Sequence, residues 1–225
     1  NKAANELKER LSVLLGPGAQ DIWAMTFHSA CCRILRRDIE RMGYTKSFTI
    51  YDTDDSKKAG AEAMKRLNID EKLLPIKSVM NTISRAKDRL LSPEAFAMEA
   101  GQDFRQKQIA DIYREYQGIL AQSNALDFDD IIYVTVKLLQ EHEDVRSYYQ
   151  RKFKYVLVDE YQDISRQRFD LTKALSEVTN AKIIAVGDDW QSIYAFSGSD
   201  ITLFTKFAEK MGYAKMLKIV KRENC

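Results

Sequence analysis

Two short apolar runs in the last third of the chain each lead into acidic residues. Tyr155–Val158 runs directly into Asp159 and Glu160, and the later run AKIIAVG runs into the acids at 188–189. A helical stretch, Arg166 to Val178, separates the two runs. Continuously apolar strands in strand–helix–strand order are typical of a parallel sheet covered on both faces. Ligands of such sheets bind at the carboxyl ends of the strands, where these acids lie.

The first acidic pair has residue types that suit phosphoryl transfer. A carboxylate at the end of a buried strand is held rigidly, and Asp159 would suit a hard cation such as Mg²⁺. Glu160, one residue later and one methylene longer, could orient a water molecule beside that metal. The alternative is that both acids favour the N-terminus of the next helix, which starts near Ser165. The residues alone leave both interpretations open. As metal ligands they would suggest a metal-dependent phosphohydrolase, which needs more converging carboxylates or histidines than two strand ends supply.

The rest of the chain indicates two kinds of structure. Ile22–Phe27 predicts a buried strand and Ser47–Asp52 a weaker one. From about residue 52 to 122 apolar residues recur at helical spacing without strand-like runs. Leu126–Ile132 predicts a helix start with Asp127 as N-cap. We therefore expect the residues before about 51 and after about 122 to share one parallel sheet, with a helical lobe between them.

Composition excludes some classes of protein. The chain has 225 residues, 45% hydrophobic and 30% charged, which is typical of a globular protein. No run of about 18 apolar residues appears, so no membrane span is expected. Because 35 basic residues nearly cancel 33 acidic ones, any nucleic-acid surface must be a local patch. Three cysteines, two of them adjacent, favour free thiols, a reducing compartment and hence a cytoplasmic location.

Five motifs occur in the order found in one family. DEYQD, from Asp159, and GDDWQSIYAFSGS, from Gly187, resemble motifs II and III of the UvrD/Rep-type helicases of superfamily 1. TFHS, from Thr26, and LDFDD, from Leu126, resemble the motifs that precede and follow the inserted helical domain of those enzymes. NKAANELKER resembles the end of motif Ia, entered partway. The resemblance spans almost the whole chain and is closest to helicase IV-like members.

The resemblance implies an α/β fold: a RecA-like parallel sheet with helices on both faces, interrupted by an all-helical inserted subdomain. Residues 1–50 and 122–225 would form the two parts of the RecA-like motor domain, and residues 51–121 the helical insertion. The chain would then be an interior piece of a longer protein. That protein would be an ATP-dependent DNA helicase that translocates 3′ to 5′ on single-stranded DNA and unwinds duplexes, with a role in DNA repair.

The resemblance also assigns roles to single residues. Asp159 would coordinate the Mg²⁺ of MgATP, and Glu160 would be the catalytic base toward water. Gln162 and Gln191 would sense the γ-phosphate, since amides both donate and accept hydrogen bonds. The residues implied to contact single-stranded or partly duplex DNA are Asn1, Lys2, Thr26, His28, Tyr194 and Phe196.

Each assignment has a structural alternative. His28 could be a polar residue bonded at a helix start, and the rings of Tyr194 and Phe196 could belong to the core. Four basic residues of the helical block could contact phosphates, although a solvated helix face is the commoner role of such residues; they are Lys77, Arg85, Lys87 and Arg89.

Some positions depart from the family pattern. Ser197 stands where the family usually has Arg, and Phe196 where many members have Trp. No GxxxxGK[ST] phosphate loop occurs in these residues, and the terminal KREN does not match the family's Asn-Tyr-Arg pattern. The chain by itself is therefore expected to be inactive. Two other functions remain open: the motor subunit of a helicase–nuclease, and a non-catalytic DNA-binding module with the motor fold.

Overall fold

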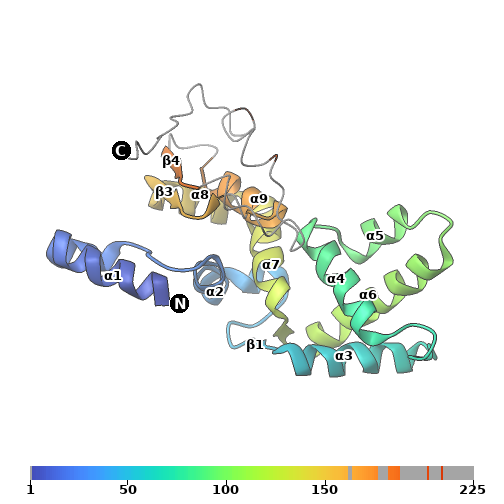
Figure 1. Cartoon of the computed structure of the whole chain (residues 1–225). Helices are drawn as coiled ribbons and strands as arrows, with labels where there is room; N and C mark the ends of the chain where they lie inside the picture. The colour runs from blue at the N-terminus through green and yellow to red at the C-terminus, as the bar shows by residue number, and fades with distance from the viewer. Residues whose placement is uncertain (1, 162–163, 177–181, 188–201, 203–208, 210–225) are drawn as a thin grey trace, which may run out of the picture.

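The computed structural model describes residues 2–161, 164–176, 182–187, 202 and 209, and most of these residues are helical (Figure 1). In chain order the described elements are α1 (Lys2–Leu15), the 3₁₀ helix η1 (Gly16–Asp21), α2 (Phe27–Asp38), the 3₁₀ helix η2 (Ile39–Met42), β1 (Thr49–Ile50), α3 (Thr53–Arg66), α4 (Ile76–Asp88), α5 (Pro93–Glu99), α6 (Phe104–Gln122), β2 (Ala125–Leu126), α7 (Phe128–Glu141), α8 (Glu143–Lys152), β3 (Tyr155–Val158), α9 (Arg166–Ser176) and β4 (Lys182–Ala185). None of the described helices is both long enough and apolar enough to span a bilayer.

The described strands form two small parallel sheets. β3 pairs with β4 over four residues, from Tyr155 opposite Lys182 to Val158 opposite Ala185. β1 pairs with β2 over two residues, next to the helical block. The parallel β3–α9–β4 unit predicted from the sequence is confirmed. The single sheet predicted for both halves of the chain is not what the described residues form, and a larger RecA-like sheet stays a prediction.

The strand predicted at Ile22–Phe27 is wrong. Phe27 is already the first residue of α2, and the four residues before Thr26 make local turns, with the amide of Ala24 donating to the carbonyl of Ile22. Trp23 anchors this segment by edge-to-face contact with Phe153, at 5.0 Å between ring centroids. The apolar run therefore packs a loop against α8. A pattern of hydrophobic residues does not distinguish such a packed loop from a strand.

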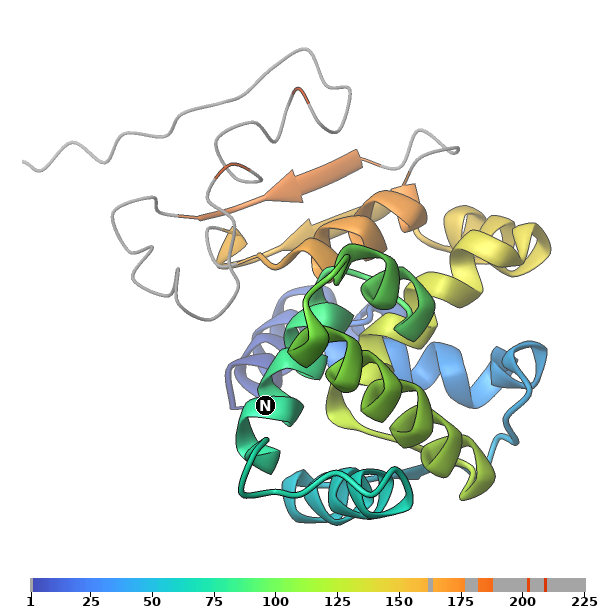
Figure 2. The same cartoon turned by 90° about the vertical axis from the view of Figure 1, so that its right-hand side faces the viewer.

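The described part of the chain has two large groups of buried apolar side chains. One group joins α2, α7, α8 and α9; among its members are Cys31, Leu35, Phe48, Leu126, Val136, Leu138 and Tyr149. The other lies within the helical block α3–α6; among its members are Ala63, Met64, Val79, Ile83, Ile109, Tyr113 and Tyr116. Figure 1 shows α3–α6 gathered on the right of the described elements, with α7 between them and β3–β4, and Figure 2 looks onto this helical block.

The helical periodicity predicted for the block is confirmed, with exceptions at single positions. Leu67, whose spacing continues the apolar face formed by Ala63 and Met64, is 37% exposed. Of the four basic residues expected to be solvated, Arg85 is exposed, and Arg89 is exposed and pairs with Glu99 on α5. Lys87 is fully buried instead. Periodicity alone could not show this, because a buried lysine depends on partners from distant parts of the chain.

Candidate functional site

The carboxyl ends of β3 and β4 meet as the sequence predicts. The amide of Val186, just after β4, donates to the carbonyl of Val158, and the amide of Tyr161 donates back to the carbonyl of Val186, both at 2.9 Å. Asp159 and Glu160 lie between these two bonds and are exposed. Tyr161 is fully buried and burial raises the pKa of its hydroxyl. Val158 and Tyr161 are buried here, whereas Tyr155 and Leu157 of β3 are exposed, so a partly buried base carries the two solvent-facing carboxylates.

The turn that carries these acids has a backbone conformation that few side chains adopt. Glu160 has φ +50°, in the left-handed region, which costs of order 1 kcal/mol or more for a residue other than glycine. Asp159 accepts a hydrogen bond from the amide of Glu160 through Oδ1, at 3.0 Å. This bond holds the Asp159 carboxylate beside the turn, and both the metal and the helix-capping interpretation stay predictions.

The donor set at this edge fits Mg²⁺ bound mainly by a nucleotide. Within residues 2–161, 164–176 and 182–187, no three His, Cys, Asp or Glu side chains converge on one point. Asp159 therefore offers one carboxylate, and phosphate oxygens and water would have to complete the coordination. Mg²⁺ in phosphoryl-transfer sites is commonly bound in this way, by one or two carboxylates together with substrate phosphates.

A second polar region lies where α1 approaches the N-terminus of α2. Thr26 is the N-cap of α2, and its Oγ1 accepts from the amide of Ser29 at 3.2 Å. A hollow of about 380 Å³ opens beside it, lined by Ala4, Asn5, Lys8, Met25, Thr26, Ser29 and Arg33. Two basic side chains, two hydroxyls and a helix N-terminus favour an anion such as a nucleic-acid phosphate.

His28, in the first turn of α2, stacks on Phe128, the first residue of α7. The imidazole of His28 lies 3.8 Å from the ring of Phe128, with the planes 20° apart. Phe128 is 59% exposed, so one face of this pair is available to solvent. Burial and, second, the positive charge of Arg168 lower the pKa of His28 to about 4, against the opposing effect of a hydrogen bond to the Phe128 backbone. His28 is thus neutral at physiological pH and acts as an aromatic surface.

Phe27 packs between the end of β3, which carries Asp159 and Glu160, and the core behind the N-terminus of α2. Its ring packs against the small cluster formed by Val158, Tyr161, Ile164 and Phe169 at the end of β3. It also packs against the larger core around α2 and α7. Thr26 and His28 flank Phe27 in the sequence, so a shift of the β3 end would be transmitted to both residues through one side chain.

Known proteins identify the family. The sequence profile of the UvrD/REP helicase N-terminal domain matches residues 1–212. The ATP-dependent DNA helicase PcrA of Bacillus subtilis (strain 168) is 45% identical over 217 residues, covering 96% of this chain and 29% of that protein. The protein of the same name from Staphylococcus epidermidis (strain RP62A) is 42% identical over 217 residues, with 96% and 30% covered. This chain belongs to the UvrD/REP helicase N-terminal domain family. It spans less than a third of the length of these relatives.

Several residues that the UvrD/REP resemblance singles out lie outside the described residues. They are Asn1, Gln162, Gln191, Tyr194 and Phe196. Lys2 is described as the exposed first residue of α1, the helix that supplies Ala4, Asn5 and Lys8 to the hollow. Thr26 and His28 share the N-terminal turn of α2, whereas Asp159 and Glu160 lie across Phe27 from them.

Sequence reasoning missed three described residues of this UvrD/REP chain that the geometry singles out. Lys8 and Arg33 line the hollow, and Phe128 carries the exposed face of the ring pair. The sequence spacing could have indicated Arg33, because it follows Ser29 of the TFHS motif by four residues and therefore lies on the same helix face. Phe128 had a signal too, since it is an apolar residue directly after an N-cap and between acids, where burial is not expected.

Proposed function

We propose that this chain is the larger part of the first motor domain of an ATP-dependent DNA helicase. The whole protein would hydrolyse ATP, translocate on single-stranded DNA in the 3′-to-5′ direction and unwind duplexes. The observation that carries the proposal is the position of Phe27, in contact with both the β3 end and the core behind the His28–Phe128 pair. A nucleotide site and a DNA site that both contact the partly buried Phe27 could be coupled through movement of this side chain.

The domain assignment is part of this proposal. Residues 1–50 and 122–225 would belong to a RecA-like motor domain and residues 51–121 to an inserted helical subdomain. Support comes from the two separate buried clusters, one within α3–α6 and one around α2, α7, α8 and α9. Just after the proposed second boundary, Ala125 still packs in the first of these clusters and Leu126 packs in the other.

For the nucleotide we propose MgATP at the acidic edge. Asp159 would hold the Mg²⁺ and Glu160 would accept a proton from the attacking water, while Gln162 and Gln191 would contact the γ-phosphate. The metal would supply charge neutralisation of the phosphates. Support for the first two roles is that both carboxylates are exposed on a turn fixed by backbone bonds between β3 and β4.

For DNA we propose a path along the N-terminus of α2. Phosphates would lie in the hollow near Thr26 with Lys8 and Arg33, and a base would stack on Phe128, whose other face is backed by His28. Tyr194 and Phe196 would provide further stacking, and Asn1 and Lys2 would extend the phosphate contacts. Stacking on aromatic rings tolerates any base, which suits a protein that moves along the strand.

Two alternatives predict different experimental results. A helicase–nuclease subunit would carry the same motor chemistry and add DNA cleavage. A non-catalytic module would bind DNA without any DNA-stimulated hydrolysis of ATP. We favour a motor over the non-catalytic module because both acids needed for hydrolysis are present and exposed at the strand end. The proposal includes a cytoplasmic location and a role in DNA repair.

The test compares two exposed phenylalanines in the longer protein that contains this chain. Phe128→Ala should weaken single-stranded DNA binding by about 1–3 kcal/mol and lower DNA-stimulated ATPase activity. Phe104→Ala is the matched control, because Phe104 is 74% exposed at the start of α6 in the helical block. Equal effects of the two changes on DNA affinity would refute the DNA path, and absence of ATPase in the unmodified longer protein would refute the motor.

A further inference from the structure

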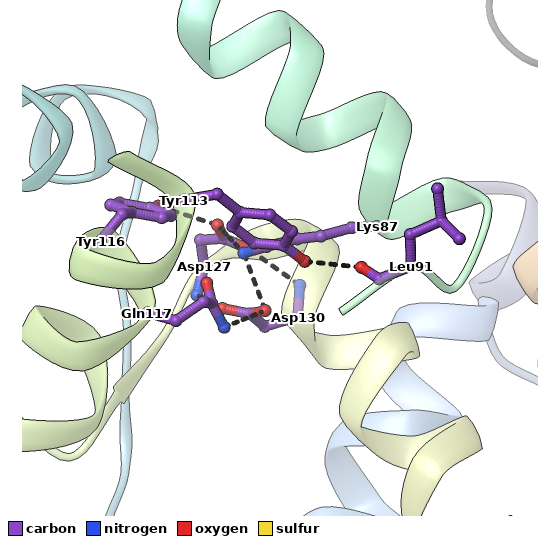
Figure 3. A network of polar contacts seen from close by, with 7 residues as sticks. All are labelled: Lys87, Leu91, Tyr113, Tyr116, Gln117, Asp127 and Asp130. Atoms are coloured by element: carbon purple, nitrogen blue, oxygen red, sulfur yellow. Dashed lines mark hydrogen bonds and ion pairs between the residues drawn. The ribbon is translucent and has the colours of Figure 1, made fainter. Parts of the chain in front are cut away.

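A buried ammonium group connects the helical block to the start of α7. Lys87, near the end of α4, has no exposed surface, and its Nζ lies 2.5 Å from Oδ2 of Asp127 and 2.8 Å from Oδ1 of Asp130. Tyr116 and Gln117 of α6 donate to the same two carboxylates, at 2.8 and 3.2 Å (Figure 3). The side chains of two helices of the block thus converge on two acids of α7.

These two acids form the capping box of α7. The amide of Asp130 donates to Oδ1 of Asp127 at 2.8 Å, and the amide of Asp127 donates to Oδ2 of Asp130 at 3.1 Å. A capping box fixes the direction in which the chain enters a helix and the conformation of its first turn. Both acids of this box are buried, and the ammonium of Lys87 compensates their charge.

The charges in the network are strongly interdependent. Burial and the neighbouring Asp127 raise the pKa of Asp130 to about 7. Burial also opposes ionisation of Asp127, but Lys87 outweighs it and holds that pKa below its usual value. Burial disfavours the charged form of Lys87 as well, and the two aspartates overcome this effect and raise its pKa. Removing the ammonium would leave two acids facing each other in a dry site, which is strongly unfavourable.

Phe128 immediately follows the N-cap Asp127, and its backbone therefore lies inside the capping box. Its ring has more than half its surface exposed and is held on one side by the stack on His28. Few other contacts can restrain an exposed ring, so its orientation depends on the backbone of the first turn. Both acids of that turn are paired with Lys87, which belongs to a different helix, α4.

We propose that Lys87 is a positioning residue for the DNA-facing edge: through the Asp127–Asp130 capping box it holds Phe128 against His28. Lys87 itself touches no substrate, because it is fully buried. The helical block thereby sets the geometry of a contact that lies outside the block. The role in DNA binding rests on the proposed function, whereas the effect on the ring pair can be measured without DNA.

The first test uses the two histidines of the 225-residue chain as probes. Proton NMR resolves His28 from His142, and a His142→Asn variant assigns the signals. Stacking on Phe128 shifts the ring-proton signals of His28 upfield. Lys87→Met should move these signals toward the position they take in Phe128→Ala. The control is Lys77→Met, which changes an exposed lysine of the same helix and should leave the His28 signals unchanged. His28 signals in Lys87→Met that match the unmodified chain would overturn the proposal.

A second variant separates positioning from general stability. Lys87→Met combined with Asp130→Asn removes one charge of each sign but does not restore the link between α4 and α7. Urea unfolding should show a recovery of stability relative to Lys87→Met alone, while the His28 signals should stay displaced. Recovery of both stability and the original signals would mean that charge balance alone maintains the ring pair, which would overturn a role for the Lys87 bridge. The double variant also provides a folded sample if Lys87→Met does not fold.

The third test measures DNA binding in the longer protein with a fluorescent oligothymidine. Lys87→Met and Phe128→Ala should each weaken binding by about five-fold or more, and their combination should weaken it no further than Phe128→Ala alone. Additive losses would overturn the proposal, because independent sites add. If Phe128→Ala leaves affinity unchanged, the proposed DNA contact fails, and the NMR result still decides whether Lys87 positions the ring pair.

Discussion

The half-buried, neutral His28 should make the stability of this domain depend on pH in a predictable direction. Its pKa in the folded chain is about 4, against 6.5 for an ordinary histidine. Between these two values the unfolded chain binds a proton that the folded chain does not bind. Lowering the pH through this window therefore favours unfolding. The contribution of His28 to stability is fully present above pH 6.5 and is lost as the pH falls toward 4.

The magnitude follows from the difference between the two pKa values. At pH 5 the unfolded imidazole is almost entirely protonated and the folded one largely neutral, which corresponds to about 2 kcal/mol. Since the ring is only half-buried, solvent screening reduces this value, and we expect about 1–2 kcal/mol. Arg168 contributes to the shift by repulsion, so Arg168→Gln should recover a small part of the loss.

The assay is urea unfolding at pH 7.5 and pH 5, in the unmodified chain and in His28→Gln. The glutamine cannot titrate, so its stability should change less between the two pH values, by the 1–2 kcal/mol that His28 supplies. Changes common to both proteins, such as protonation of other acids, cancel in this comparison. An equal pH dependence in the two proteins, or a larger one in His28→Gln, would refute the buried neutral imidazole.

Two further predictions concern other parts of the chain. In the longer protein, Glu160→Gln should spare MgATP binding and slow hydrolysis by a factor of about a hundred or more. Asp159→Ala should weaken the Mg²⁺-dependent binding itself, and equal Michaelis effects with unchanged turnover numbers would contradict both roles. In the helical block, Gly118→Ala should raise unfolding stability by roughly 0.5–1 kcal/mol, because nothing lies within 4 Å of the added methyl group in mid-helix α6. Gly60→Ala should gain less or lose stability, because its methyl group would come within 2.6 Å of Met80 Sδ; urea midpoints that rank the two glycines in the opposite order would contradict this packing.

Local sequence signals were sufficient wherever one segment determines its own structure. Asp127 caps α7 as predicted, because an acid followed by an apolar period has few other stable arrangements. Tyr155–Val158 and the run beginning at Lys182 form parallel strands as predicted, since both are short, apolar and bounded by polar residues. The acids after the first strand therefore fall at the sheet edge that the pattern indicates.

Sequence signals failed where the structure depends on distant partners. Ile22–Phe27 has the composition of a strand, but Trp23 finds aromatic partners on α8, more than 120 residues later in the chain. Lys87 has the spacing of an exposed charge, but two acids some 40 residues later compensate it in the interior. Periodicity describes one helix at a time, so it cannot register a charge that is paired across two helices.

The same long-range pairing limits how the helical block can move. Separating α4 from α7 would leave the ammonium of Lys87 and two carboxylates without partners in an apolar site, at a cost of several kcal/mol. Separating α6 from α7 would break the bonds of Tyr116 and Gln117 to the same acids. A change at the proposed nucleotide site that reaches α7 through Phe27 is therefore expected to carry the end of α4 with it. The block would follow α7 as one rigid unit, and any bending would have to occur in segments that lack this buried network.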